Sequence, residues 1–350
     1  MTGDVPRPVL LPPNRFDHFY LGGERIAALR GGPGGPRRPE EWLASTTTRA
    51  GAAPQGLSRL PDGSLLRDRV LADPTAWLGD EHVARYGGQG VELLVKLIDA
   101  GQRLPVHLHP ARAFSRRHLG ITHGKTEAWV VVDADPGAVV GLGLRRPLTY
   151  EQVGGLVAAH DGAALVDALH VREVRPGDGV LVPAGTPHFI GAGVLVVEVQ
   201  EPTDLSILLE WDDFDVDGDR DGHLDLGYDV ALQALDLAVW TPADLDGHVR
   251  PAAPPVGGAL RTALPAGADP YFRADFVEAG PSTVAVPPGL AVLVMLRGEG
   301  RLRTTESGAL PVARGDVALV PWCAGRWELE GEVGGVLCRP PAPDAPAAPR

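Results

Sequence analysis

The sequence predicts a mainly β protein built from two barrels, with a short helical insertion in the first barrel. Glycine (45) and proline (34) are both abundant without a collagen-like period, which suits many short strands joined by tight turns. Apolar segments of strand length recur between those turns. With 350 residues and 44% hydrophobic content, the chain is long enough for two ordinary domains with sizeable cores.

Charge and cysteine content restrict the classes of partner and compartment. The net charge of −13 argues against nucleic acid or an anionic membrane as a general partner. Neither a signal peptide nor a run of 18 apolar residues is evident. Cys323 and Cys338 are the only cysteines and form no ladder of spacings, which disfavours a disulfide framework. We expect a cytoplasmic protein that is a monomer or a homodimer.

The first barrel is predicted over residues 91–234, after a turn-rich, irregular or β segment (1–90) that packs on it. The near-continuous apolar run at Val91–Ala100 predicts a strand buried on both faces. Residues 111–124 are expected to form a basic, polar loop. Apolar residues at three-to-four spacing predict two short helices in the insertion 149–169. Further strands are expected at 103–110 and 126–134 and in the segments HVREV, GVLVPAG and GVLVVEVQ.

A second barrel is predicted over residues 235–340. Its segment ARGDVALVP has a residue pattern similar to that of VRPGDGVLVP in the first half. The second half lacks the histidines described below, so we expect it to be metal-free. Trp322 and Trp327 are interpreted as core or rim packing. The proline- and alanine-rich end, 341–350, is predicted to be disordered.

Four residues of the first half form a candidate metal site. His107 and His109 are two residues apart, so on a strand both imidazoles point to the same face. Glu127 begins another strand, and His188 ends the segment GDGVLVPAGTPH. Three imidazoles and a carboxylate suit Zn²⁺, and also another divalent transition metal such as iron, manganese, nickel or cobalt.

Together, His-x-His, a downstream strand Glu and Gly-x5-Pro-x-Gly-x2-His resemble the two motifs of cupins, which are double-stranded β-helix barrels. Over about 90–232 the chain resembles the type I phosphomannose isomerases. The similarity lies in the segments LLVKLIDAGQRLPVHLHP, HGKTEAWVVVDADPGA and VRPGDGVLVPAGTPHFIGAGVLVVEVQEPTDLSILLEWD. The segments LGGERI and EEWLAST resemble the family more weakly. The resemblance implies metal binding by His107, His109, Glu127 and His188, with His107 where the family usually has Gln.

The resemblance also implies a metal-dependent isomerase that interconverts mannose 6-phosphate and fructose 6-phosphate through a cis-enediol, with a small phosphorylated sugar as its partner. Lys125, in Gly-Lys-Thr-Glu, is expected in the cavity, where it would hold a sugar oxygen or phosphate. Lys96 and Lys125 are the only lysines in the chain. Glu198 aligns with a family active-site Glu and is the candidate base; the alternative is a buried structural carboxylate. Arg220 and His223 match a downstream Arg-x-x-His of bacterial members.

Two departures from the family pattern affect the substrate end. Pro105 replaces a Ser, and Ile207-Leu208 replaces a Tyr-Arg pair whose Arg is an active-site cation. Leucine carries no charge and donates no hydrogen bond, so that function is lost at Leu208. We hypothesise that the loop after His109 supplies the missing cation; the alternative is a solvated basic loop. The candidate residues are Arg112, Arg116 and Arg117.

Other functions remain open at this stage. The chain could be a non-catalytic, metal-containing sugar-binding or regulatory cupin, or an isomerase of a different sugar. An iron-dependent oxygenase is a third hypothesis, which metal identity would decide because zinc has no redox change to offer. The acidic segment DDFDVDGDRDGHLD resembles the start of an EF-hand calcium-binding loop. Its twelfth position is Leu224 instead of the required Glu, so a solvated turn is the better interpretation.

Overall fold

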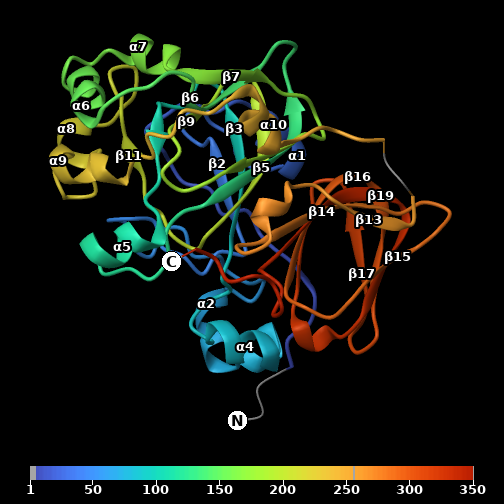
Figure 1. The fold of residues 1–350 in the computed structure, drawn as a ribbon. Coiled ribbons are helices and arrows are strands. Elements are labelled where there is room, and N and C mark those ends of the chain that lie inside the picture. Colours follow the sequence, from blue (N-terminus) through green and yellow to red (C-terminus); the bar gives the residue numbers. More distant parts are fainter. Residues whose placement is uncertain (1–4, 255–256, 350) are drawn as a thin grey trace.

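The computed structural model describes residues 5–254 and 257–349 (Figure 1), whose strands form three sheets. The first unit consists of two of these sheets, and all of their strand pairs are antiparallel. The six-stranded sheet contains, in spatial order, β12 (Val249–Arg250), β8 (Gly179–Val182), β5 (Glu127–Ala134), β10 (Val194–Gln200), β3 (Leu94–Ala100) and β2 (Glu40–Leu43). The five-stranded sheet contains β11 (Ile207–Leu208), β4 (His107–Leu108), β9 (His188–Ile190), β6 (Val139–Leu144) and β7 (Leu169–Glu173).

The interior of the first unit lies between these two sheets. One buried cluster joins Ile98 and Val131 of the six-stranded sheet to Val140, Leu142 and Ile190 of the five-stranded sheet. Because successive side chains of a strand point to opposite faces, only alternate residues of each strand reach this interior. The two sheets therefore enclose a space into which alternate side chains project.

The outer face of the six-stranded sheet is apolar as well. On β10, Val197 and Val199 belong to a cluster on the outer face of this sheet, whereas Glu198 between them faces the interior of the first unit. On β3, the apolar neighbours of Lys96 are in that same outer cluster. This explains why β3 is buried along its whole length, as the apolar run at 91–100 predicted. Each central strand thus has one face for packing and one for the interior.

The second unit is a curled eight-stranded sheet, whose strands are orange to red in Figure 1 except for β1, which comes from the blue N-terminal segment. Its interior is a separate cluster that includes Trp327, which is fully buried as expected, whereas Trp322 is partly exposed. The sheet contains β1 (Val9–Leu10), β18 (Val317–Val320), β16 (Ala291–Thr304), β19 (Trp327–Arg339), β14 (Arg273–Glu278) and β13 (Ala259–Thr262), with β15 (Val284–Val286) on β19 and β17 (Gly308–Ala313) on β16.

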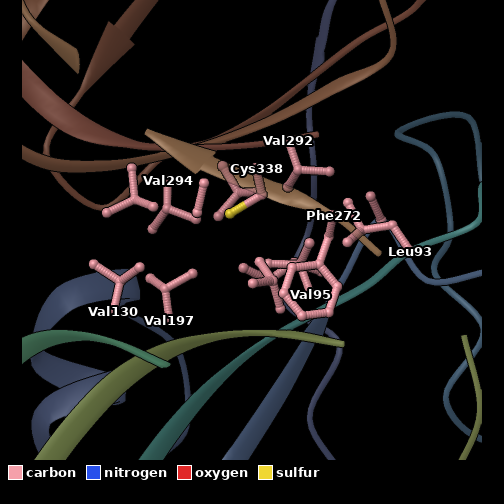
Figure 2. Close-up of a cluster of buried hydrophobic side chains, with 14 of the residues drawn as sticks. Leu93, Val95, Val130, Val197, Phe272, Val292, Val294 and Cys338 are labelled. Carbon is pink, nitrogen blue, oxygen red and sulfur yellow. The ribbon is translucent and has the colours of Figure 1, made fainter. Parts of the chain in front are cut away.

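The two units share a hydrophobic core. Figure 2 shows where Val130 and Val197 of the first unit face Val292, Val294 and Cys338 of the second. Each of these side chains is buried, and burying a valine stabilises a fold by about 1.5–3 kcal/mol. The units are therefore packed together through an apolar interface. Cys338 lies in it as a free, buried thiol.

The N-terminal segment bridges both units and does not pack on the first alone. β1 pairs with β18 of the second unit, while β2 joins the first. Gly79 lies so close to the indole of Trp322 that a Cβ there would be 2.6 Å from the ring. The segment also contains more helix than the irregular structure expected: α1 (Arg25–Arg30), α2 (Leu66–Ala72), α3 (Pro74–Leu78) and α4 (Asp80–Tyr86).

Helices also occupy the connections of the first unit. The insertion contains α6 (Tyr150–Ala158) and α7 (Gly162–Asp167), and Thr149 caps α6 in a capping box. The expected basic loop at 111–124 instead begins with a helix, α5 (Arg112–His118), in which the rings of Phe114 and His118 pack one turn apart, at 4.5 Å between ring centroids. The remaining helical segments are α8 (Gly218–Asp221), α9 (Tyr228–Ala231), α10 (Pro242–Gly247), η1 (Leu232–Ala234), η2 (Ala266–Ala268) and η3 (Trp322–Ala324).

Residues 342–345 of the C-terminal segment lie against α4. The Tyr86 hydroxyl donates a hydrogen bond to the Ala342 carbonyl at 3.1 Å, and Arg85 donates to the carbonyls of Pro343 and Ala345. Donors on α4 thus satisfy a proline-rich stretch that has few donors of its own. Within the described residues, none of the helices has the length and apolar character needed to span a bilayer.

Candidate functional site

Antiparallel pairing brings the three candidate histidines together. His107 on β4 and His188 on β9 are direct register partners, and their ring centroids are 4.1 Å apart. His109 follows β4 directly, and its ring centroid is 4.9 Å from each of the other two. One nitrogen of each ring lies within 4.8 Å of the others, and all three residues are buried. The spacing expected from His-x-His on a strand is therefore realised.

Backbone carbonyls determine which nitrogen of each imidazole is free. The Nδ1 atoms of His107, His109 and His188 lie 2.8, 2.7 and 2.8 Å from the carbonyl oxygens of Pro105, Leu205 and Thr186. A carbonyl only accepts hydrogen bonds, so each Nδ1 carries the proton and each Nε2 presents a lone pair. This arrangement is typical of metal-bound histidine, where a carbonyl orients the ring through its other nitrogen.

Glu127 completes the cluster from the opposite sheet. Its Oε2 lies 2.9 Å from Nε2 of His109, and its Oε1 lies 3.2 Å from Nε2 of His188. Oε2 and both Nε2 atoms are buried without a satisfied hydrogen bond. Buried polar atoms are rarely left unsatisfied, and three converging lone-pair donors are what a cation requires. The residues present therefore fit a divalent metal.

The electrostatics favour the protonation states that metal binding needs. Burial, and then the charge of Lys125, lower the pKa of His109 to about 3. Burial, and then the neighbouring imidazoles, lower the pKa of His107 well below its usual value. Burial alone would raise the pKa of Glu127, but Lys125 and His109 hold it far below the usual range. The imidazoles of His107 and His109 are thus neutral and the carboxylate of Glu127 is ionised at neutral pH.

A cavity of about 700 Å³ opens beside the cluster. His107, Lys125, Glu127 and Glu198 all line it, as the sequence predicted for Lys125 and Glu198. Lys125 is buried, and its Nζ lies 3.2 Å from Oε2 of Glu127. The volume of the cavity is within the range of small-molecule binding sites.

Glu198 is held by two donors. The indole N–H of Trp129 donates to Oε2 of Glu198 at 3.2 Å and to Oε1 of Glu127 at 3.1 Å. Nζ of Lys96 lies 3.4 Å from Oε1 of Glu198. Burial, and then the charge of Glu127, raise the pKa of Glu198 to about 7. A divalent cation beside it would favour the ionised form and lower that pKa. The buried cationic partner of Glu198 is thus Lys96.

Lys96 connects the cavity to residues that sequence reasoning missed. Its Nζ also lies 3.4 Å from Oε2 of Glu40, on β2. The Tyr20 hydroxyl and the Trp42 indole donate to Glu40 at 2.5 and 2.7 Å. The one signal in the sequence was the rarity of lysine, because both lysines of the chain line this cavity. Glu40 and Tyr20 carried no such signal.

Arg220 and His223 lie at the edge of the site or outside it. Arg220, on α8, lines the cavity with an exposed side chain that pairs with Asp221 at 2.6 Å and approaches Asp217 at 3.8 Å. The Asp217 side chain also accepts from the backbone N–H of Arg220, which caps α8. His223 does not line the cavity; its ring contacts the Asp219 carbonyl and the Gly227 N–H.

The basic segment after His109 does not face the cavity. Arg116 and Arg117 are exposed on α5, and neither they nor Arg112 is among the lining residues. Arg112 pairs with the buried carboxylate of Glu201 and lies over the Tyr271 ring, 5.6 Å from its centroid. The structure therefore does not bring the arginines of this segment to the cavity wall, where the missing cation was expected.

Both departures from the family pattern lie beside the metal cluster. Pro105 lines the cavity, and its carbonyl accepts from His107. On β11, Leu208 is the register partner of His107 and lines the cavity, whereas Ile207 is buried in the core. The wall is therefore apolar at Leu208, where a cation was expected.

Comparisons with known proteins agree with this architecture, although no family model matches the chain. It is 28% identical over 302 residues to a mannose-6-phosphate isomerase of Streptococcus mutans, covering 84% of this chain and 86% of that protein. The solved mannose 6-phosphate isomerase of Bacillus subtilis has a TM-score of 0.70 at 20% identity, covering 95% and 100% of the chains. A solved mannose 6-phosphate isomerase bound with zinc and yttrium has a TM-score of 0.71 at 17% identity, covering 96% and 100%.

These similarities extend through both units and the N-terminal segment, well beyond the stretch at 90–232 that the motifs cover. The mainly β fold predicted from the sequence is confirmed. Over most of its length the chain is similar to mannose-6-phosphate isomerases, and its fold is that of the solved phosphomannose isomerases.

Proposed function

We propose that the protein is a metal-dependent aldose–ketose isomerase that interconverts mannose 6-phosphate and fructose 6-phosphate. One observation carries the proposal: three oriented Nε2 atoms converge with Glu127 at the wall of a cavity that also contains Glu198. The relatives named mannose-6-phosphate isomerase, which match most of the chain, support the same reaction.

We propose Zn²⁺ as the metal, held by His107, His109, Glu127 and His188. Three nitrogen donors and one oxygen donor suit zinc, and a solved relative contains it. Other divalent transition metals accept the same donors. When bound, such an ion supplies Lewis-acid polarisation of the sugar's carbonyl and hydroxyl oxygens.

The protein's own groups perform the proton transfer. Glu198 removes the proton from C2 of the open-chain aldose and delivers a solvent-exchangeable proton to C1, while the hydroxyl proton of O2 passes to O1, so the substrate passes through a cis-enediol. Trp129 and Lys96 hold the two carboxylate oxygens of Glu198 in place for this transfer. The Lys125 ammonium group donates to a sugar oxygen at the same wall. The site is buried, which limits competition from bulk water.

The test is proton exchange followed by NMR. The metal-loaded protein is incubated with fructose 6-phosphate in D₂O, and mannose 6-phosphate formation and deuterium at C2 are measured. Both are expected, and Glu127→Ala is expected to abolish both together with metal binding. Glu198→Gln is the matched variant: it should keep the metal yet lose exchange by at least about a hundredfold. If the metal-loaded protein gives neither product nor deuterium, the proposal is wrong.

Leu208 supports a second candidate, a sugar-binding or regulatory protein that retains the metal without turnover. An apolar side chain stands beside His107, where the related enzymes have a cation. This candidate has no need of a base. Saturable sugar-phosphate binding without any C2 exchange would favour it over the isomerase.

A further inference from the structure

Four positively charged side chains line the cavity, and three of them are paired with carboxylates. Lys96 lies between Glu40 and Glu198, and Lys125 contacts Glu127, all within 3.4 Å. Arg220 is paired with Asp221. Arg49 is the fourth, and in residues 5–254 and 257–349 no carboxylate oxygen lies within 4.0 Å of its guanidinium group. The cavity thus contains one cation whose charge is not neutralised by direct pairing.

Neutral groups fix the position of Arg49. One Nη atom donates to the Asp17 carbonyl at 2.7 Å and to the Gln55 side chain at 3.0 Å. The guanidinium carbon lies 5.5 Å from the centroid of the Phe16 ring. The backbone is held as well, because the Arg49 N–H donates to the Gln55 carbonyl at 2.8 Å. A half-buried guanidinium is therefore oriented in advance, with its Nε and second Nη donors left for a ligand.

One carboxylate of the cavity wall, that of Asp204, is hydrogen-bonded to the backbone next to Arg49. Asp204 also lines the cavity, and its Oδ2 accepts the N–H of Ala50, the residue after Arg49, at 2.9 Å. That bond secures the Arg49 loop to the first unit without neutralising the guanidinium. Arg49 is close enough to the deeper cavity residues to lower the pKa of His18, although burial lowers it more.

We propose that Arg49 binds the anionic phosphoryl end of the substrate and provides the cation that Leu208 cannot. The proposal rests on the function proposed above and names the residue that recognises its substrate class. A guanidinium group matches phosphate with two parallel hydrogen bonds, and it is the residue type that binds phosphate most specifically. The cavity of about 700 Å³ is lined by both His107 and Arg49, and its volume accommodates a hexose phosphate.

The kinetic test separates binding from chemistry. Arg49→Gln should raise KM for mannose 6-phosphate roughly ten- to hundredfold, because a charge-assisted hydrogen bond is lost, while kcat changes less than about threefold. Arg49→Lys should recover part of the loss, since lysine keeps the charge but not the paired geometry. Arg38→Gln is the matched control: Arg38 pairs with Asp17 close by but does not line the cavity, so KM should not change.

A binding measurement makes the test independent of turnover. Mannitol 6-phosphate has no carbonyl and cannot isomerise, so calorimetry reports its Kd directly. Arg49→Gln should weaken it by the same ten- to hundredfold as KM, at an unchanged thermal midpoint. If the protein binds mannitol 6-phosphate through Arg49 but isomerises nothing, this inference holds and the proposed function fails. If it isomerises mannose 6-phosphate while Arg49→Gln leaves KM and Kd unchanged, the inference is wrong and the function stands.

Discussion

Lys96 and Glu198 are register partners on neighbouring strands, and their side chains meet inside the first unit, with Nζ 3.4 Å from Oε1. Both are almost fully buried. Lys96 also faces Glu40, so one ammonium group separates two buried carboxylates. Removing one member of a buried ion pair leaves the other charge uncompensated, which is far more costly than losing a surface pair.

We therefore expect Lys96→Met to destabilise the protein by about 3–5 kcal/mol at neutral pH, measured by denaturant unfolding. Adding Glu198→Gln should restore part of the lost stability, because Glu198 is one of the two buried carboxylates that Lys96→Met leaves without a cation. Arg303→Met is the surface control: its pair with Glu330 is half-exposed, and its loss should cost at most about 1 kcal/mol. Equal effects of the two single changes would contradict a buried ionic cluster.

The histidines at the metal cluster should differ in how well they tolerate replacement. We expect His107→Gln to retain close to one metal per chain, since the amide oxygen can also ligate and the side chain borders the cavity. His188→Leu should retain less than a tenth, because this ring is fully enclosed and packs on His107 and Trp129. The metal content is measured by elemental analysis after gel filtration. Equal retention by both variants would mean that the metal binds elsewhere.

The metal cluster and the cavity charges differ in how far the sequence could predict them. The alternation of side chains on a strand is a local property, so it placed His107 beside His109 and Lys125 near Glu127 without knowledge of the fold. The contact between Lys96 and Glu198 depends on the register of β3 with β10, and Glu40 enters from β2, more than fifty residues earlier. Register and long-range pairing are not encoded in any local spacing.

Arginine positions were the least predictable part of the site. Arg112, Arg116 and Arg117 form a basic run, and a run of charge indicates only that a segment is basic, not which way it points. The segment forms α5, and none of these side chains lines the cavity. Arg49 lies in a turn-rich stretch with no motif around it; what distinguishes it is its place in the cavity and the absence of a paired carboxylate among the described residues.

Because Arg116 and Arg117 do not line the cavity, we now expect that they do not bind the substrate. We expect the double variant Arg116→Glu/Arg117→Glu to leave KM for mannose 6-phosphate unchanged within about twofold, because exposed charges outside the cavity are screened by salt. The measurement is made at about 0.15 M ionic strength, with Arg49→Gln assayed alongside as the variant that should change KM. An increase of fivefold or more in the double variant would show that the segment reaches the substrate.

Acid should destabilise the protein partly through His82, far from the metal cluster. His82 is buried on α4 against Tyr86, with Nε2 unsatisfied, and burial lowers its pKa to about 4. The unfolded chain, with a pKa near 6.5, binds a proton that the folded chain rejects, so stability is full above that value and falls as the pH drops toward 4. Between pH 7 and 5 this one group should cost about 2 kcal/mol.

The prediction is tested by comparing unfolding free energies of the wild type and His82→Leu across that pH range. The variant cannot gain a proton at this position when it unfolds, so its curve should be flatter than the wild-type curve by about 2 kcal/mol between pH 7 and 5. The other histidines contribute equally to both curves and cancel in the difference. Parallel curves would mean that water reaches His82 and that its pKa is ordinary.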